Sequence, residues 1–296
     1  MSHMKRLLII GCGDIARRVI PLLAGRYRIC ALIRTAARGK ALSAQGIMPI
    51  HGDLDEPASL ARLAGLADIV LHLAPPPNAG ILDTRTRHLL AALSRGRLPE
   101  RFVYISTSGV YGDCGGAVVG ETRAIHPQNA RAQRRADAER QIRGWAGRNG
   151  VQASILRVPG IYAAERLPLE RIRAGTPAFV AAEDGYTNHI HADDLAHVIV
   201  AALRRGKANR VYHASDDSEL RMGDYFDAVA DAHGLPRPPR VSRAEAQRVL
   251  PESLLSFMNE SRRLSNERMK RELKAVLRYP TVAAALQSLA AGAAAR

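Results

Sequence analysis

The sequence is poor in cysteine and contains no long apolar run. Its three cysteines, Cys12, Cys30 and Cys114, show neither a CxxC motif nor the cysteine–histidine spacing of a metal site. We therefore expect reduced thiols, no bound metal and a cytoplasmic location. No stretch reaches the roughly 18 uncharged apolar residues needed to span a bilayer, so we expect neither a signal peptide nor a membrane partner.

Lysine and aromatic residues are also scarce, although the formal net charge is +15. Lysine occurs only at positions 5, 40, 207, 270 and 274, so arginine carries almost all of the positive charge. Such an excess permits nucleic-acid binding. However, the arginines are scattered along helical patterns, and aromatic residues make up only 4% of the chain. We expect an arginine-rich solvated surface, which an anionic cofactor or substrate can share, rather than a nucleic-acid site.

The feature that organises the chain is a glycine turn between an apolar run and a helical pattern. Leu7–Ile10 is typical of a strand buried on both faces, and the next helix is expected from Ile15 to Leu23. Gly11 can form the tight turn, Gly13 allows the backbone to approach a pyrophosphate, and Ala16 permits close helix packing. Glycines also serve ordinary turns, but this context favours a dinucleotide site. The expected contacts are Gly11, Gly13, Asp14 and Ile15.

Strand and helix patterns alternate through the first half of the sequence. Further strands are expected at 28–33, 47–51, 68–73, 102–105 and 151–157, and helical patterns at 58–63, 81–93 and 128–148. This βαβ alternation predicts an α/β fold with a Rossmann-like, doubly wound parallel sheet.

The last third of the chain differs in character. Pro236-Arg237-Pro238-Pro239 forms a stiff turn, and helical segments are expected near 242–258, 266–274 and 281–291. We interpret residues 5–158, with 187–215 returning to them, as a dinucleotide-binding Rossmann domain. Residues 159–186 and 216–292 are then a smaller, mostly helical substrate cap. The cap would cover the carboxyl edge of the sheet, where doubly wound folds bind ligands.

The end of the second strand distinguishes NADP from NAD. An acidic side chain there would accept hydrogen bonds from ribose hydroxyls and repel a 2′-phosphate. This chain instead has Arg34, with Arg38 one helical turn later. Arginine binds phosphate with two hydrogen bonds, so NADP is favoured over NAD. The alternative is that both arginines are merely exposed.

Two further loops are expected to contact the cofactor. Asp53 and Leu54 follow the third strand and would lie near the adenine. Ala74, Pro75 and Pro76 follow the fourth strand as a rigid loop along the diphosphate and ribose.

Several motifs then occur in a fixed order: the turn at 11–16, Gly52-Asp53-Leu54, residues 105–112 (ISTSGVYG), residues 156–162 (LRVPGIY), residues 188–196 (NHIHADDLA), residues 265–268 (SNER) and residues 277–280 (LRYP). In this order they resemble an extended or atypical short-chain dehydrogenase/reductase of the NAD-dependent epimerase/dehydratase group. The resemblance implies an NAD(P)-dependent oxidoreductase or an epimerase/dehydratase-like enzyme. Its substrate would be small and polar, such as a nucleotide sugar or a carbonyl compound. It also implies that Pro159 contacts the nicotinamide, and that a homodimer could form through helices near 80–95 and 128–148.

The sequence departs from this group at its catalytic motif. Members pair a serine or threonine after strand five with Tyr-x-x-x-Lys on the next helix. The threonine corresponds to Thr107, while the tyrosine and lysine positions fall on Arg131 and Arg135. No tyrosine lies between Tyr111 and Tyr162. The usual proton donor is therefore missing.

Arginine changes the chemistry available at this position. A guanidinium keeps its proton up to about pH 12, so Arg131 is a poor general acid near neutrality, although it can stabilise an oxyanion or anchor an anion. Arg135 can replace lysine as an anchor for the ribose. A proton would have to come from Tyr111, Thr107 or water, unless Tyr111 only packs and the two arginines only face solvent. The alternative function is a redox-silent NADP(H)-binding sensor.

Overall fold

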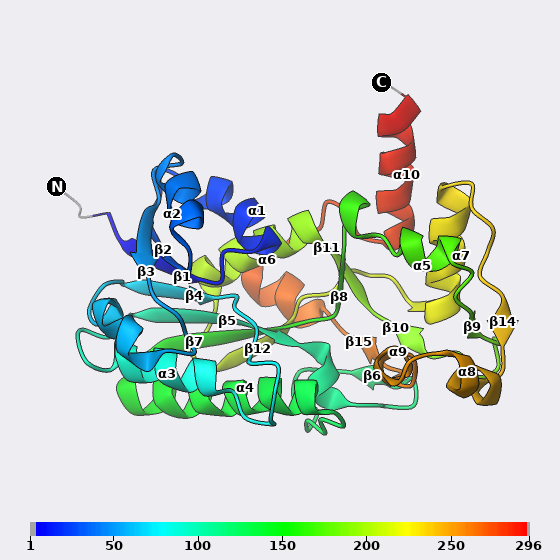
Figure 1. The fold of residues 1–296 in the computed structure, drawn as a ribbon, viewed down its shortest axis with the longest axis horizontal. Coiled ribbons are helices and arrows are strands. Elements are labelled where there is room, and N and C mark those ends of the chain that lie inside the picture. The colour runs from blue at the N-terminus through cyan, green and yellow to red at the C-terminus, as the bar shows by residue number, and fades with distance from the viewer. Residues whose placement is uncertain (1–3, 295–296) are drawn as a thin grey trace.

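The computed structural model describes residues 4–294 and contains one large parallel sheet (Figure 1). The strands run in the order β12-β7-β5-β4-β1-β2-β3, and every neighbouring pair is parallel. Their bounds are β1 Arg6–Ile10, β2 Arg28–Ile33, β3 Met48–His51, β4 Ile69–His72, β5 Arg101–Thr107, β7 Gln152–Val158 and β12 Arg210–His213. The expected Rossmann-like sheet is confirmed. The direction of connection reverses between β1 and β4, where such sheets bind their ligands.

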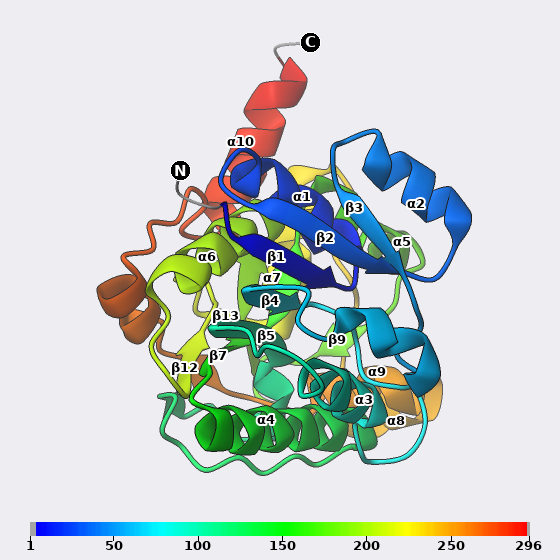
Figure 2. The same cartoon turned by 90° about the vertical axis from the view of Figure 1, so that its left-hand side faces the viewer.

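Helices cover both faces of the sheet because successive side chains of a strand point to opposite faces. Leu7 and Ile9 pack in a core with α1 Asp14–Leu23 and α6 Ala192–Arg205, whereas Leu8 and Ile10 pack with α3 Thr84–Leu93 and α4 Ala130–Asn149. Figure 2 shows the sheet between these two pairs of helices. The apolar run of β1 is therefore buried on both faces, as its sequence predicts.

Some elements differ from the sequence-based expectation. The helical pattern at 58–63 forms a 3-10 helix, η1 Pro57–Leu63, and α3 begins at Thr84 because the Asp83 side chain caps it by accepting from the Thr86 amide. A short α2, Ala36–Ser43, follows β2. The edge strand β12 has no counterpart among the expected strands.

The remaining segments gather beyond the carboxyl ends of the strands. They contain η2 Ser108–Tyr111, β6 Val118–Val119, β8 Gly160–Tyr162, η3 Ala164–Arg166, α5 Leu169–Arg173, β9 Ala178–Phe179, β10 Tyr186–Thr187, β11 His189–His191, β13 Leu220–Arg221, α7 Met222–Ala232, β14 Arg240–Val241 and β15 Arg263–Leu264. Four two-stranded pairs, β8 with β11, β9 with β14, β10 with β13 and β6 with β15, connect these segments. A separate apolar core includes Tyr162, Ile172, Phe226 and Val282.

The C-terminal helices are more broken than the sequence pattern indicates. The segment 242–258 forms two helices, α8 Arg243–Val249 and α9 Glu252–Met258, separated at Pro251. The segment 266–274 contains a five-residue π-helix, η4 Met269–Leu273, which ends where Lys274 takes a left-handed conformation with φ +55°. The last expected helix corresponds to α10 Val282–Ala294. Within residues 4–294 no helix is long and apolar enough to cross a bilayer, and no group of three His, Cys, Asp or Glu side chains is arranged to hold a metal.

Candidate functional site

A cavity of about 550 Å³ lies at the carboxyl ends of β1, β2 and β4. It is lined by Ile10, Gly11, Cys12, Gly13, Asp14, Ile15, Ala16, Leu32, Ile33, Arg34, Thr35, Arg38, Gly52, Asp53, Leu54, Leu73, Ala74, Pro75, Arg85, Ile161 and Arg166. The structure therefore brings together all of the residues expected to bind a cofactor except Pro76 and Pro159. Pro76 is a buried residue of the loop after β4, and half-buried Pro159 lies between β7 and β8.

The two glycines of the turn serve different physical purposes. Gly11 has φ +94°, and a Cβ there would come within 2.5 Å of the Ala74 nitrogen, so only glycine fits between β1 and the loop after β4. Gly13 precedes α1, and a Cβ there would meet no atom within 4 Å. Because Gly13 also lines the cavity, its missing side chain leaves space at the N-terminus of α1. A pyrophosphate fits such a space, since the amides of the first helical turn point into it.

Two exposed arginines line the cavity after β2, namely Arg34 at the end of the strand and Arg38 in α2. The Arg38 guanidinium donates to the carbonyl of Cys12 and so bridges from α2 to the glycine turn. Burial raises the pKa of the Cys12 thiol to about 11, with Arg38 acting in the opposite direction. The thiol therefore stays protonated near neutral pH, and positive charge dominates this part of the cavity.

The loop after β3 is held against β2 by a backbone hydrogen bond, which the Gly52 amide donates to the Ile33 carbonyl at 3.0 Å. Within the loop, the Asp53 carboxylate accepts from the Asp55 amide at 3.0 Å. Leu54 is buried, whereas Asp53 is half-buried at the cavity wall. An apolar and a carboxylate group are thus available in the region where an adenosine is expected.

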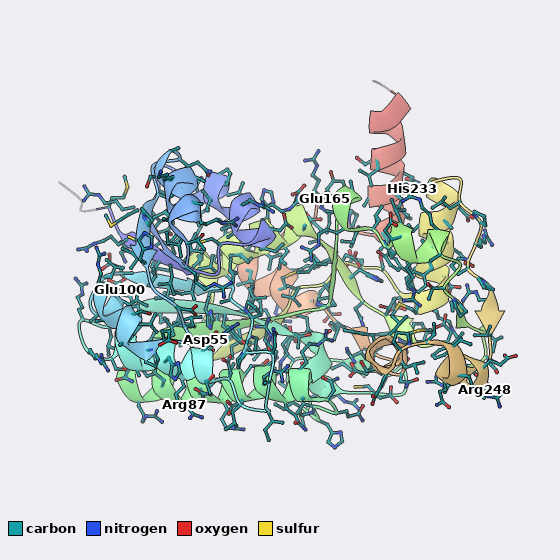
Figure 3. The ribbon with its side chains drawn as sticks, viewed as in Figure 1. Asp55, Arg87, Glu100, Glu165, His233 and Arg248 are labelled. Atoms are coloured by element: carbon teal, nitrogen blue, oxygen red, sulfur yellow. The ribbon has the colours of Figure 1, made fainter. Side chains whose placement is uncertain are left out.

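Arg85 of α3 is a cavity residue that sequence reasoning missed. It donates two hydrogen bonds to Asp55, at 2.6 and 2.8 Å, and two more to the carbonyls of Pro75 and Pro76, at 3.2 and 3.3 Å. These hydrogen bonds from Arg85 lower the pKa of the Asp55 carboxyl. Arg85 thereby fixes the proline loop to the loop after β3. Figure 3 labels Asp55 on the α3 side of the molecule. No local sequence motif marks Arg85 or Asp55.

Arg166 is a second cavity residue without a sequence signal. It belongs to η3, and its Nη1 donates to the Asp14 carboxylate at 3.0 Å. Asp14 is the first residue of α1, so this contact joins the segment after β8 to the glycine turn.

The residues expected to be catalytic lie around the end of β5. Thr107 is half-buried, and its hydroxyl oxygen accepts from the Gly109 amide at 3.2 Å, so the hydroxyl proton stays available. Arg135 donates to the Tyr104 hydroxyl at 2.9 Å and to the Ile105 carbonyl at 2.8 Å. Arg131 is exposed, and its guanidinium lies 3.9 Å from the ring centre of Phe257 in α9. One turn of α4 therefore presents one arginine to β5 and the other to a C-terminal helix.

Tyr111 is buried, and its hydroxyl is fully engaged. The oxygen accepts from Arg157 Nη1 at 2.6 Å and lies 2.6 Å from His213 Nε2. Arg157 also forms two hydrogen bonds with Glu139, at 2.6 and 3.1 Å. Burial lowers the pKa of His213 to about 3, so this imidazole is neutral near pH 7. The Tyr111 hydroxyl is thus part of an internal network rather than of the cavity wall.

Comparison with known proteins agrees with the fold and with the cavity. A family profile described as NAD(P)H-binding matches residues 11–205. An NAD(P)H azoreductase of Xenophilus azovorans is 25% identical over 269 residues, covering 86% of this chain and 85% of that protein. A conserved protein of unknown function from Silicibacter pomeroyi DSS has a TM-score of 0.78 at 28% identity, with 97% of this chain and 99% of that one covered.

A more distant structure shares the fold. The dTDP-glucose 4,6-dehydratase DesIV of Streptomyces venezuelae, with NAD bound, has a TM-score of 0.76 at 21% identity, covering 97% of this chain and 96% of that one. The structural neighbours thus include proteins of the epimerase/dehydratase group, in agreement with the resemblance of the sequence motifs. Since the profile covers well over half of the sequence and includes the strands from β2 to β11, this chain belongs to the NAD(P)H-binding family.

Proposed function

We propose that this protein is an NADP(H)-dependent oxidoreductase with a non-standard active site, acting on a small polar substrate. The observation that carries the proposal is the arginine-lined cavity at the carboxyl ends of β1, β2 and β4. A dinucleotide phosphate is strongly anionic, and its binding requires close backbone approach and cationic side chains. The glycine turn and the arginines of the cavity supply both.

The cavity residues divide among the parts of the cofactor. The glycine turn and the first amides of α1 would hold the pyrophosphate, and Arg34 and Arg38 would hold the 2′-phosphate. Asp53 and Leu54 would flank the adenosine, and the loop from Ala74 to Pro76, fixed by Arg85, would follow the diphosphate and ribose. When bound, NADPH supplies a hydride to the substrate.

The chain's own residues would then stabilise the charge that develops on the substrate. A carbonyl that accepts a hydride gains negative charge on oxygen, which Arg131 can stabilise without transferring a proton. Arg135 would position the nicotinamide ribose from its anchor on β5. The hydroxyl proton of Thr107, or water, would complete the reduction, because the hydroxyl of Tyr111 is already engaged.

The substrate would bind beyond the sheet edge. We propose that residues 159–186 and 216–292 form a cap over this edge, with Arg131 facing the cap through Phe257. A reductase role is in line with the name of the azoreductase relative. A homodimer through α3 and α4 is part of this proposal.

A redox-silent NADP(H) sensor is the second candidate. The missing tyrosine and the engaged Tyr111 hydroxyl favour it, because neither leaves a conventional proton donor beside Thr107. A sensor would bind the cofactor with the same groups but would not turn it over.

The proposal is tested by titrating the protein with NADPH and NADH in a calorimeter. We expect tighter binding of NADPH. Replacing Arg34 with Asp should weaken NADPH binding by about 10- to 100-fold, because a charged hydrogen bond contributes roughly 1.5–3 kcal/mol and is replaced by repulsion. The affinity for NADH, which has no 2′-phosphate, should change much less.

The matched control is Arg87→Asp, which makes the same charge change on an exposed residue of α3 (Figure 3). It should leave both affinities unchanged. Binding of neither dinucleotide by the wild-type protein would refute the proposed function. Binding of NADPH without its oxidation by any member of a carbonyl and azo-compound panel would favour the sensor instead.

A further inference from the structure

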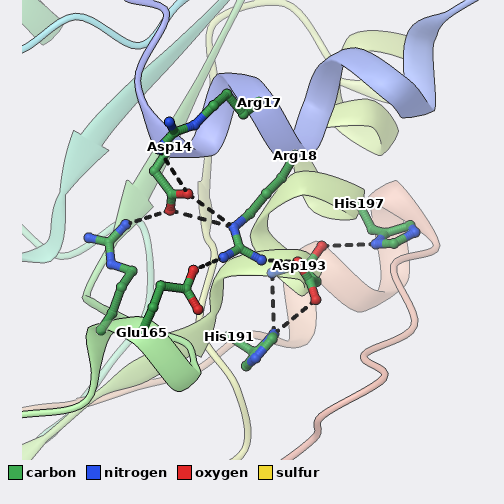
Figure 4. Close-up of polar contacts among 8 residues, drawn as sticks. Asp14, Arg17, Arg18, Glu165, His191, Asp193 and His197 are labelled. Atoms are coloured by element: carbon green, nitrogen blue, oxygen red, sulfur yellow. Dashed lines mark hydrogen bonds and ion pairs between the residues drawn. The ribbon is translucent and has the colours of Figure 1, made fainter.

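A cluster of six charged residues lies beside the glycine turn. Its carboxylates are Asp14, Glu165 and Asp193, and its guanidinium groups are Arg17, Arg18 and Arg166. Figure 4 shows Arg18 between Asp14, Glu165 and Asp193. The cluster therefore ties α1 to η3 and to the first turn of α6, three segments that are far apart in the sequence.

Arg18 and Arg166 have different surroundings within this cluster. Arg18 contacts all three carboxylates and is about one-fifth exposed. Arg166 contacts only Asp14, through Nη1, and its side chain is 35% exposed. Among the described residues no protein group accepts a hydrogen bond from its Nε or Nη2. Arg166 also lines the cavity, whereas Arg18 does not. It is therefore the member of the cluster with free donors at the site.

The position of Asp14 explains why a cation is needed there. Asp14 is the first residue of α1, and its carboxylate lies where the helix amides would receive the pyrophosphate. Burial opposes ionisation of this carboxyl, but hydrogen bonds from Arg166 and Arg18 lower its pKa. The group is thus anionic near neutral pH. Two negative phosphates beside a carboxylate would repel one another unless a cation lay between them.

We propose that Arg166 binds the pyrophosphate of the dinucleotide through Nε and Nη2 while Nη1 stays on Asp14. This inference rests on the proposed cofactor site. A guanidinium carries five N–H donors in a planar fork, so it can bridge a carboxylate and a phosphate at once. In this arrangement Asp14 orients Arg166 and Arg166 shields the phosphates from Asp14.

The same contact would link cofactor binding to the segment that follows β8. Arg166 and its neighbour Glu165 both belong to η3, and Glu165 already pairs with Arg18 of α1. Two contacts, Glu165 with Arg18 and Arg166 with Asp14, already hold η3 to α1, and occupation of the pyrophosphate site would add a third. Since η3 lies near the start of the proposed cap segment 159–186, the bound cofactor would fix that part of the cap.

The experiment compares two ligands in calorimetric titrations of the full chain. NADPH contains the pyrophosphate, and 2′-AMP contains the adenosine and the 2′-phosphate without it. Replacing Arg166 with Ala should weaken NADPH binding about tenfold or more and leave the affinity for 2′-AMP unchanged. Arg166→Lys should lose less NADPH affinity than Arg166→Ala. Arg173→Ala serves as the matched control, because Arg173 is exposed on α5 and pairs only with exposed Glu170. It should change neither affinity.

An Asp14→Asn background separates direct binding from a purely positioning role. If Arg166 contacts the phosphates, Arg166→Ala should still cost about tenfold in that background. If Arg166 only neutralises Asp14, the loss should disappear once the carboxylate is gone, and the inference is then wrong. It is also wrong if Arg166→Ala binds NADPH as the wild type does, or if it weakens 2′-AMP equally. Failure of the wild-type protein to bind any dinucleotide would instead refute the proposed function itself, and this inference with it.

Discussion

Replacing Tyr111 with Phe removes one hydroxyl from the buried network at the end of β5. His213 Nδ1 lies 2.9 Å from the Ser265 carbonyl, which can only accept, so Nδ1 carries the proton and Nε2 accepts from the Tyr111 hydroxyl. The same hydroxyl oxygen accepts from Arg157. The substitution therefore breaks two hydrogen bonds and leaves a donor of Arg157 and an acceptor of His213 without partners.

The cost in stability follows from these two bonds. A hydrogen bond to a charged group contributes about 1.5–3 kcal/mol and a neutral one about 0.5–1.5 kcal/mol. We therefore expect a loss of about 2–4 kcal/mol in the free energy of unfolding. For a chain of this size that corresponds to a decrease of about 5–10 °C in Tm. NADPH binding should not change, because Tyr111 is not in the cavity wall.

Calorimetric unfolding gives the stability, and titration of the same sample gives the NADPH affinity. Tyr27→Phe is the control, since Tyr27 packs against the sheet core and its hydroxyl makes no hydrogen bond among the described residues. It should stay within about 0.5 kcal/mol of the wild type. An unchanged Tm for Tyr111→Phe, combined with a loss of about 100-fold or more in NADPH turnover, would refute this reasoning and identify Tyr111 as the proton donor.

Two further predictions concern the glycine turn and the buried histidines. Gly11→Ala should lose at least about 2 kcal/mol of unfolding free energy and should also lose NADPH binding, because its Cβ would collide with Ala74 and its φ is positive. The control Gly25→Ala has φ +73° and open space around its Cβ, so it should lose only about 1 kcal/mol of unfolding free energy. Equal losses in the two variants would contradict the argument. Burial lowers the pKa of His189 from 6.5 to about 3, so below pH 6.5 the unfolded chain binds a proton that the folded chain does not, and stability falls with pH down to about 3. His189→Phe should reduce the slope of unfolding free energy against pH in this range by about 1.4 kcal/mol per unit relative to the wild type; an unchanged slope in denaturant titrations would contradict it.

The sheet could be predicted from the sequence because each of its inner strands is defined locally. Leu7–Ile10 shows strand burial through an unbroken apolar run, and the glycine turn fixes where the helix begins. The edge strand β12 was not expected, since Arg210–His213 is short and half polar. The split of 242–258 into α8 and α9 occurs at Pro251, which has no amide proton to donate to a continuing helix.

The candidate site was predictable only where its residues adjoin strand ends. Arg34 directly follows β2 and Asp53 comes two residues after the end of β3, so topology alone brings both to the cavity. Arg85 and Arg166 arrive from α3 and η3, and their roles depend on partners, Asp55 and Asp14, that are 30 and 152 residues away. Such contacts carry no local periodicity or spacing, and only the folded structure reveals them.

The arginines differ in whether carboxylates neutralise them, and this difference indicates which of them can bind an anionic ligand. Arg157 is neutralised by Glu139 inside the protein, and Arg18 by three carboxylates between helices, so these residues hold the fold together. Arg34 forms no direct ion pair among the described residues and lines the cavity, where its charge helps to lower the pKa of the Asp55 carboxyl. In a concave site the cavity walls reduce screening by solvent, so a cation without a direct ion-pair partner there attracts a small anion strongly. A scattered, exposed cation attracts a nucleic acid less strongly, because solvent screens it. This argument supports the proposed dinucleotide phosphate, rather than nucleic acid, as the anionic ligand of the cavity.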